Sequence, residues 1–317
     1  MSSSNTYFTY FDQGYAALGL AAVDTLRTVT GDRVVVFAMS DLAVTVANQL
    51  DEWSVEVIDL ETLLTFEPAL NDVRETRSTA SFMWSVVPTL FKFVLAADVS
   101  CRSAVYFDAD TQFLRDPGSA FNGDARDPDV FLTPHHYEPY CDMTIHSGFF
   151  CVQFVRCKRD ASDDFLDWWE DTCLRFASDV ATERDFGDQK CLDRAVEMFP
   201  QIHFETNVSR FVGPWNAGSL GPDTIQIHLH GAGRQDGRLQ LAPSSFQLGP
   251  AARTFASGLS LAQRFASELD LDLPQRASAK PSLLERADQK GAQATPHLLA
   301  ALRRLRHDAH TRRMRAR

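Results

Sequence analysis

The first hundred residues alternate short runs rich in β-branched and aromatic residues with longer stretches that have helical periodicity. Continuous apolar runs such as VVVFAM at residues 34–39 are typical of strands buried on both faces of a parallel sheet. Helices between successive strands are the usual connections in such a sheet. The alternation therefore predicts an α/β fold in which a mostly parallel central sheet is flanked by helices.

The same patterns predict the individual elements. Strands are predicted over residues 6–11, 33–39, 54–60, 104–107, 130–133, 148–155 and 224–229. Helices are predicted over residues 14–27, 41–50, 78–97 and 188–198, and around the acidic stretch DDFLDWWED at residues 163–171. Pro88 lies inside one of these helices and is expected to kink it.

Strand patterns stop after about residue 241, and the rest of the chain has a different composition. Residues 242–317 are rich in Ala, Ser, Pro, Gln and Arg, with helical patches near 260–269 and 296–306. The stretch PQRASAKPS between these patches is typical of a linker. We therefore expect one large domain over residues 1–241 and a helical C-terminal extension over residues 242–317.

The charge of the chain is uneven. The formal net charge is −11, yet the last twenty residues hold seven Arg and one Asp, a local balance of +6 that leaves −17 on the rest. The acidic body argues against nucleic acid as the main partner, because phosphate backbones need a broad cationic surface. The Arg-rich tail is either a solvated end or a peripheral attachment to an anionic membrane surface.

Signals for a membrane span or a zinc site are weak. The N-terminus has no cationic segment followed by an apolar stretch, and no window approaches the roughly 18 apolar residues of a membrane span. The six cysteines form no CxxC pair, which favours reduced thiols in a core over zinc ligands. We therefore expect a cytoplasmic protein without a transmembrane anchor.

Asp108-Ala109-Asp110 is the first candidate for chemistry. Two carboxylates two residues apart can share one divalent cation with phosphate oxygens, because hard cations prefer oxygen ligands. Such a cation directly stabilises the negative charge that develops on a nucleotide diphosphate leaving group. The triplet is common in acidic chains, but here it follows a predicted strand directly, at the sheet edge where α/β folds bind ligands.

The sequence IHLHGAGR at residues 227–234 is the second candidate. His228 can complete the coordination of a metal, the glycines let backbone N–H groups approach a phosphate, and Arg234 can pair with phosphate oxygens. The other interpretation is that alternate histidines at the end of a strand are polar surface positions. His230 is expected on the opposite side of the strand from His228 and is ranked below it.

Several segments of the chain, taken in order, resemble GT-A nucleotide-diphospho-sugar transferases of glycosyltransferase family 8. The resemblance covers roughly residues 7–234 and rests on FTYFDQGYAALGLAAVDTL, VYFDADTQFLRDP, SGFFCVQF, FGDQKCLD, PWN and HLHGAGR. It implies a GT-A catalytic domain and a metal-dependent glycosyltransferase that uses Mn²⁺ or Mg²⁺. It also implies a nucleotide diphosphate donor, with a UDP-sugar favoured, and retention of the anomeric configuration. The acceptor, whether a glycan, a lipid-linked sugar, a protein or a small molecule, is not named by the sequence.

The resemblance assigns the two candidate clusters to one site. Asp108, Ala109 and Asp110 match the family's acidic motif, whose two carboxylates bind the metal, and His228 matches the third metal ligand. Gly231 and Arg234 match the residues that contact the pyrophosphate. Arg234 replaces the usual lysine, and its planar guanidinium is not equivalent to a compact ammonium group.

Further donor contacts are implied in the first hundred residues. Tyr15 corresponds to the position whose ring stacks on the nucleotide base, and Thr9 lies on the neighbouring strand. Arg77 and Lys92 resemble basic positions that contact the donor phosphates.

The donor sugar is expected to lie against the middle of the chain. Asp188 and Gln189 match residues that bond the sugar hydroxyls and lie near the anomeric carbon, although Asp188 is also suited to cap a helix. His146 and Ser147 stand where the family commonly has Asn before a small residue. An imidazole presents different donors and more bulk than an amide, so the sugar can differ from the usual glucose or galactose.

Two other functions stay open. A catalytically degenerate protein would bind a nucleotide sugar without transferring it. A haloacid-dehalogenase-like phosphatase would use Asp108 as its nucleophile, because FDADT has the required spacing. That class also needs a later acidic pair after a strand, whereas the candidate pair Asp163 and Asp164 has no strand pattern before it.

Overall fold

A seven-stranded sheet forms the centre of the computed structural model, which describes residues 5–41, 53, 55–121, 127–235, 238–241 and 247–271. Its strands lie in the order β3 (Glu56–Asp59), β2 (Arg33–Ala38), β1 (Asn5–Phe11), β4 (Ser103–Phe107), β7 (Phe150–Lys158), β6 (Val130–Pro134) and β8 (Ile202–Phe204). Every pairing is parallel except those that β7 makes with β4 and β6. The start of β7 therefore lies at the same edge of the sheet as the ends of β1, β4 and β6.

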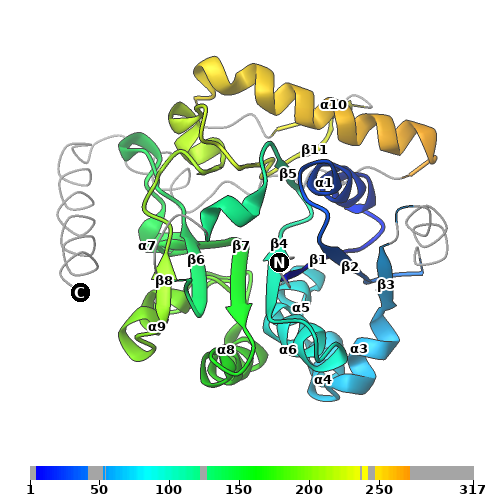
Figure 1. Ribbon diagram of the computed structural model, residues 1–317, viewed down its shortest axis with the longest axis vertical. Coiled ribbons are helices and arrows are strands. Elements are labelled where there is room, and N and C mark those ends of the chain that lie inside the picture. Colours follow the sequence, from blue (N-terminus) through cyan, green and yellow to red (C-terminus); the bar gives the residue numbers. More distant parts are fainter. Residues whose placement is uncertain are drawn as a thin grey trace.

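Helices cover both faces of the sheet (Figure 1). One face carries α1 (Ala16–Val29), against which α10 (Ala252–Glu268) packs. The other face carries α3 (Leu60–Phe66), α4 (Ala69–Thr76), α5 (Thr79–Ser85), α6 (Val87–Ala97) and α8 (Asp163–Phe176). Each face buries its own apolar cluster, so the sheet lies between two cores.

A small three-stranded sheet continues directly from the acidic motif. It consists of β5 (Thr111–Phe113), β10 (Gln226–His228) and β9 (Phe211–Val212). Because β10 is antiparallel to β5, His228 lies opposite Thr111, and the N–H of Leu229 donates to the carbonyl of Asp110 at 2.7 Å. This pairing joins the two candidate clusters of the sequence.

The remaining elements are short and connect the larger ones. They are α7 (Thr144–Ser147), α9 (Leu192–Met198), the hairpin of β11 (Gly233–Gln235) and β12 (Arg238–Gln240), and 3₁₀ turns at Pro117–Ala120, Pro139–Cys141, Pro214–Ser219 and Gly249–Ala251.

The predicted α/β architecture is confirmed, with corrections to individual elements. The helix predicted over 78–97 is two helices, α5 and α6, and Pro88 lies in the first turn of the second. The helix predicted from Asp188 begins only at Leu192, so Asp188 lies in the preceding turn and caps no helix. The last predicted strand, 224–229, is shorter and belongs to the small sheet.

Several predicted segments lie wholly or partly outside the residues that the structure describes. Most of the predicted helix 41–50, the linker, the patch at 296–306 and the Arg-rich tail lie outside the described residues. The patch at 260–269 is part of α10, whose Phe255, Ala262 and Phe265 join the core on the α1 face. α10 shares a core with the first domain, and the division at residue 241 stays a prediction.

One segment corrects the expectation that no stretch is apolar enough to span a membrane. Thr79–Ala97 has a mean hydropathy of 1.5 over 19 residues, which meets that criterion by length and composition. It is 61% buried against the protein, and its apolar side chains pack in the core between the sheet and α8. The segment is therefore accounted for as the core helices α5 and α6.

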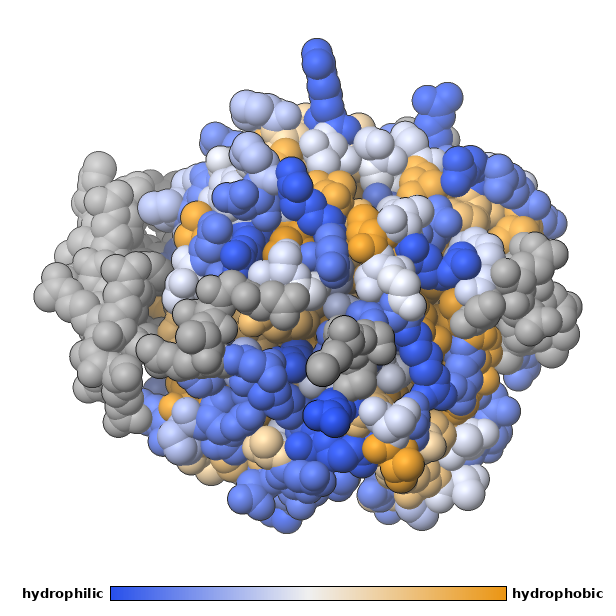
Figure 2. Space-filling model, viewed as in Figure 1, coloured by the Kyte–Doolittle hydropathy of each residue, from blue (hydrophilic) through white to orange (hydrophobic). Residues whose placement is uncertain are grey.

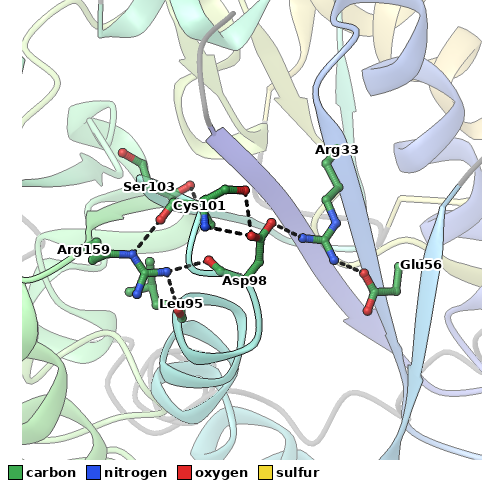
Figure 3. A network of polar contacts seen from close by, with 8 residues as sticks. Arg33, Glu56, Leu95, Asp98, Cys101, Ser103 and Arg159 are labelled. Carbon is green, nitrogen blue, oxygen red and sulfur yellow. Dashed lines mark hydrogen bonds and ion pairs between the residues drawn. The ribbon is translucent and has the colours of Figure 1, made fainter.

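An ion-pair network joins strand ends at the edge of the sheet opposite the ends of β1 and β4 (Figure 3). Arg33 at the start of β2 contacts Glu56 at the start of β3 and donates to Asp98 at 2.5 Å. Arg159 donates to the carbonyls of Asp98 and Cys101, at 2.7 and 2.8 Å. Because Arg33 is partly exposed, its ion pairs orient these ends more than they stabilise the fold.

The surface and the thiols agree with the composition. Hydrophilic side chains (blue) cover much of the face seen in Figure 2, and apolar ones (orange) form smaller patches between them. All six cysteines are buried and unpaired, as expected for reduced thiols in a core.

Replacing Phe255 by alanine should show how strongly α10 stabilises the first domain. The ring is fully buried in the core shared with α1, so Phe255→Ala should lower the free energy of unfolding by about 3–5 kcal/mol. The exposed neighbour in the same helix provides the control, since Arg253→Ala should change it by less than about 0.5 kcal/mol. Equal effects in urea denaturation would show that α10 does not belong to this core.

Candidate functional site

A cavity of about 690 Å³ opens where β1 and β4 end and β7 begins. In parallel α/β sheets this edge is the usual place for ligands. Nine of the predicted residues line the cavity: Tyr15, Asp108, Ala109, Asp110, His146, Ser147, Asp188, Gln189 and His228.

A carboxylate and two imidazoles meet on one side of the cavity. Ligand atoms of Asp110, His228 and His230 all lie within 4.8 Å of one another, a separation that one metal ion can bridge. His228 Nε2 is 2.9 Å from Asp110 Oδ1 and 3.7 Å from Asp108 Oδ2. These groups form a mixed oxygen and nitrogen donor set, of the kind that binds first-row divalent metals.

The backbone explains why residues so far apart in sequence converge. β5 begins immediately after Asp110, and its pairing with β10 places His228 beside the acidic motif. The Nδ1 atom of His228 lies 3.1 Å from Gln153 Oε1 on β7, which orients the ring so that Nε2 points to the carboxylates. A bond of this kind to the second ring nitrogen is typical of histidines that bind metals.

The histidine His230 corrects the ranking made from the sequence. The expectation that put it on the opposite side from His228 is wrong, because residues two apart along a strand lie on the same face; β10 itself ends at His228, where the chain turns. Gly231 in this turn has a φ of 74°, a backbone conformation that glycine adopts without strain. His230 therefore joins Asp110 and His228 in the cluster.

Burial and charge shift the pKa values of the cluster in opposite directions. Burial alone would raise the pKa of Asp110, but the charge of His228 and the bond with it lower that pKa. Burial alone would lower the pKa of His228, yet Asp110 holds it well above its usual value. The carboxylate and the imidazole thus stabilise each other's charged forms.

The carboxyl group of Asp108 is in a different environment. Burial raises its pKa to about 6, against the opposing charge of His228. The hydroxyl of Tyr106, two residues earlier on the same strand, donates to Asp108 Oδ1 at 2.5 Å. Burial also raises the pKa of Asp188 well above its usual value, and the charge of Asp108 adds to this. The cavity thus concentrates carboxyl groups whose mutual repulsion a cation would relieve.

The residues expected at the donor sugar form a connected group on the other side of the cavity. Gln189 Nε2 donates to the carbonyl of Ser147 at 2.9 Å, and His146 Nδ1 lies 2.9 Å from the Ser147 hydroxyl. Gly148 next to them has a φ of 88° and lies against the backbone of Lys190. The turn at 187–191 and the short helix α7 are therefore fixed to one another.

Other predicted residues have different positions. Tyr15 lines the cavity with 42% of its surface exposed, so its ring is accessible to a ligand. Thr9 is fully buried in β1 and does not line the cavity. Arg234 lies in β11, but its side chain is outside the described part of the chain.

Arg77 and Lys92 are corrections to the sequence analysis. Arg77 donates to Ser85 Oγ and to the carbonyl of Cys173, at 2.7 and 2.8 Å, which joins α5 to α8. Lys92 on α6 pairs with Glu170 and Asp167 of α8. Neither residue lines the cavity, because both hold helices together on the face of the sheet. A contact of either with donor phosphates is therefore not proposed.

The structure also adds lining residues that the sequence did not indicate. They are mostly aromatic or sulfur-containing: Met83, Trp84, Tyr106, His135, Tyr137, Met143 and Phe186. Strand alternation contained a signal for Tyr106, since it places this residue on the same side as Asp108. The others come from separate loops and helices, which no spacing rule brings together. Among the described residues that line the cavity, none is Lys or Arg.

The acidic pair required for a phosphatase is not at this site. Asp163 and Asp164 are exposed at the start of α8 and do not line the cavity. The structure therefore gives no support to the haloacid-dehalogenase-like alternative.

Replacing Gly148 by alanine should disturb the connection between α7 and the turn that holds Gln189. An added Cβ would lie 2.9 Å from Lys190 Cα, and the positive φ disfavours any other residue. Gly148→Ala should lower the free energy of unfolding by about 1–3 kcal/mol in urea denaturation. Gly31→Ala is the matched control, because a Cβ there meets no atom within 4 Å, and we expect a change below about 1 kcal/mol. Equal stability of the two variants would contradict the tight contact.

Comparisons with known proteins place this fold. No protein-family model matches the chain. It is 26% identical over 251 residues to the uncharacterized protein YfnF of Bacillus subtilis (strain 168), covering 76% of this chain and 78% of YfnF. The galactosyltransferase LgtC, solved with donor and acceptor sugar analogs, is 14% identical with a TM-score of 0.47, over 89% of this chain and 99% of LgtC.

The fold of this chain is similar to that of the bifunctional glycosyltransferase WbbM. It has a TM-score of 0.52 at 11% identity, over 87% of this chain. The match spans 52% of WbbM, so the chain corresponds to about half of that larger enzyme. The predicted GT-A-like α/β fold is thereby confirmed: the chain shares the fold of a glycosyltransferase.

Proposed function

We propose that the protein is a metal-dependent glycosyltransferase that moves a sugar from a nucleotide diphosphate donor, with UDP favoured, to an acceptor of unknown class. The observation that carries the proposal is the convergence of Asp108, Asp110, His228 and His230 at one side of a cavity. The glycosyltransferase fold supports it independently.

The charge of the cavity explains why a metal is needed. Asp12, Asp108, Asp110 and Asp188 line it, and the described lining contributes no Lys or Arg. These carboxylates would repel a diphosphate unless a divalent cation neutralised the negative charge of both groups. Arg234 is proposed as a further cation at the pyrophosphate, and the backbone at Gly231 as its neighbour.

The donor set suits a divalent first-row metal. Asp110 and His228, with His230 or Asp108, would hold it. Imidazole ligands favour Mn²⁺ over Mg²⁺, because Mg²⁺ prefers oxygen ligands alone. When bound, the cation supplies charge stabilisation to the leaving diphosphate.

For the rest of the lining we propose the roles that the family resemblance implies. Tyr15 would stack on the base. Asp188 and Gln189 would hold the sugar, with Gln189 beside the anomeric carbon, and His146 and Ser147 would border the same subsite. Retention of configuration is proposed from the family resemblance.

Removing the central ligand should abolish metal-dependent nucleotide binding. Asp110→Ala should weaken UDP binding in the presence of Mn²⁺ by at least about tenfold in calorimetry, because the carboxylate contacts His228 and faces the metal position. Asp164→Ala, an exposed carboxylate outside the cavity, should bind as the unchanged protein does. Undiminished metal dependence in Asp110→Ala would refute the proposed site.

A measurement of UDP release distinguishes the transferase from the catalytically degenerate binding protein. A transferase should release UDP from a UDP-sugar in the presence of Mn²⁺, whereas a binding protein should hold the donor without turnover.

The Arg-rich tail is proposed to attach a cytoplasmic enzyme to anionic membranes. Its balance of +6 over residues 298–317 favours this, since each basic residue near such a surface contributes about 1 kcal/mol. The full chain should co-sediment with phosphatidylserine vesicles at low salt and lose this on deletion of residues 298–317. Neutral phosphatidylcholine vesicles are the control, and binding unaffected by the deletion would exclude the proposal.

A further inference from the structure

An apolar wall borders the cavity beside the proposed sugar-binding residues. It consists of Met83 and Trp84 from the end of α5 and Phe186 from the loop before Asp188. The rings of Trp84 and Phe186 lie 5.6 Å apart, and Phe186 is 4.6 Å from the ring of His146. Trp84, Phe186 and His146 are only partly buried and line the cavity, so part of their surface is open to a ligand.

The wall is contiguous with the polar groups assigned to the donor sugar. An added Cβ at Gly187, which precedes Asp188, would lie 3.4 Å from the indole of Trp84, so the backbone here faces the ring. Gln189 bonds to the carbonyl of Ser147, and the Ser147 hydroxyl lies 2.9 Å from His146 Nδ1. With Nδ1 in this contact, Nε2 is the ring nitrogen that remains to bond a ligand. Hydrogen-bonding groups and apolar surface therefore meet in one corner.

This corner discriminates between sugar substituents. A hydroxyl that faced Met83, Trp84 and Phe186 would lose water without gaining a hydrogen bond. A methyl group would instead bury apolar surface there, worth about 0.8 kcal/mol per carbon. An anionic substituent would be repelled by the carboxylates of the described lining, which contributes no Lys or Arg.

We infer that the donor sugar carries an acetamido group, whose methyl packs on Met83, Trp84 and Phe186 while its amide bonds near His146 and Ser147. The inference rests on the proposed function, since it assigns the sugar within that donor site. It names a neutral N-acetylated hexosamine, linked to UDP, as the substrate class.

Paired donors test the inference with the full-length protein and Mn²⁺. UDP-N-acetylglucosamine against UDP-glucose, and UDP-N-acetylgalactosamine against UDP-galactose, differ only at the second carbon of the sugar. UDP release should show a kcat/KM at least about tenfold higher for the acetamido member of one pair, as a single apolar group can discriminate. Equal values, or a preference for the hydroxyl donors, would overturn the inference and leave the proposed function intact. Failure of UDP itself to bind with Mn²⁺ would overturn both.

Variants of the wall separate recognition from folding. Phe186→Ala should reduce the ratio of kcat/KM for the acetamido donor to that for the hydroxyl donor by about tenfold, because the methyl group loses its contact. Trp168→Ala removes a partly buried aromatic residue that packs on Phe165 and Phe199 away from the cavity, and its preference should equal that of the unchanged protein. A Phe186→Ala variant with both activities reduced equally would mark a structural role and refute the inference.

Discussion

The pairing of β10 with β5 is the constraint on which the candidate site depends. β5 begins one residue after the acidic motif, so any strand that pairs with it antiparallel must present its last residue to Asp110. The N–H of Leu229 bonded to the Asp110 carbonyl fixes that register, and His228 then lies 2.9 Å from the carboxylate. A slip of one residue would turn the imidazole to the other face of the strand. The position of His228 in the cluster is thus set by backbone hydrogen bonds, and the side chain of Gln153 then orients its ring.

This backbone control lets the site hold charges that would otherwise oppose folding. Asp108 and Asp188 both have raised pKa values because they are buried, whereas His228 in particular lowers the pKa of Asp110. Burying carboxyl groups together costs free energy that a sequence selected for stability alone would avoid. A cation bound by these carboxylates and a diphosphate would offset their mutual repulsion and so bind tightly. The acidity of the cavity therefore favours a metal-dependent reaction over a purely structural cluster.

The sequence predicted those parts of the site that depend on local order. Continuous apolar runs predicted β2 and β4, and the end of β4 placed Asp108 correctly at the ligand-binding edge. His230 was ranked too low, because residues two apart along a strand lie on the same face and the chain turns just after β10. Arg77 and Lys92 were assigned to the donor phosphates through the family resemblance alone, which does not determine that they contact α8 instead. The apolar wall could not be predicted from the sequence, because α5 and the loop at Phe186 come together only in the tertiary fold.

The sugar side of the cavity depends on a second set of backbone contacts. Lys190 Nζ donates to the carbonyls of Ile145 and Thr182, and Asp193 accepts from the N–H of Phe149. These bonds hold α7 and the turn around Asp188 to the start of β7, where the metal side of the cavity begins. Since Phe186 is in this turn and His146 in α7, the same contacts position the apolar wall relative to the carboxylates. These contacts set the distance between the carboxylates and the apolar wall, so the proposed selectivity for a sugar substituent would require no rearrangement of the backbone.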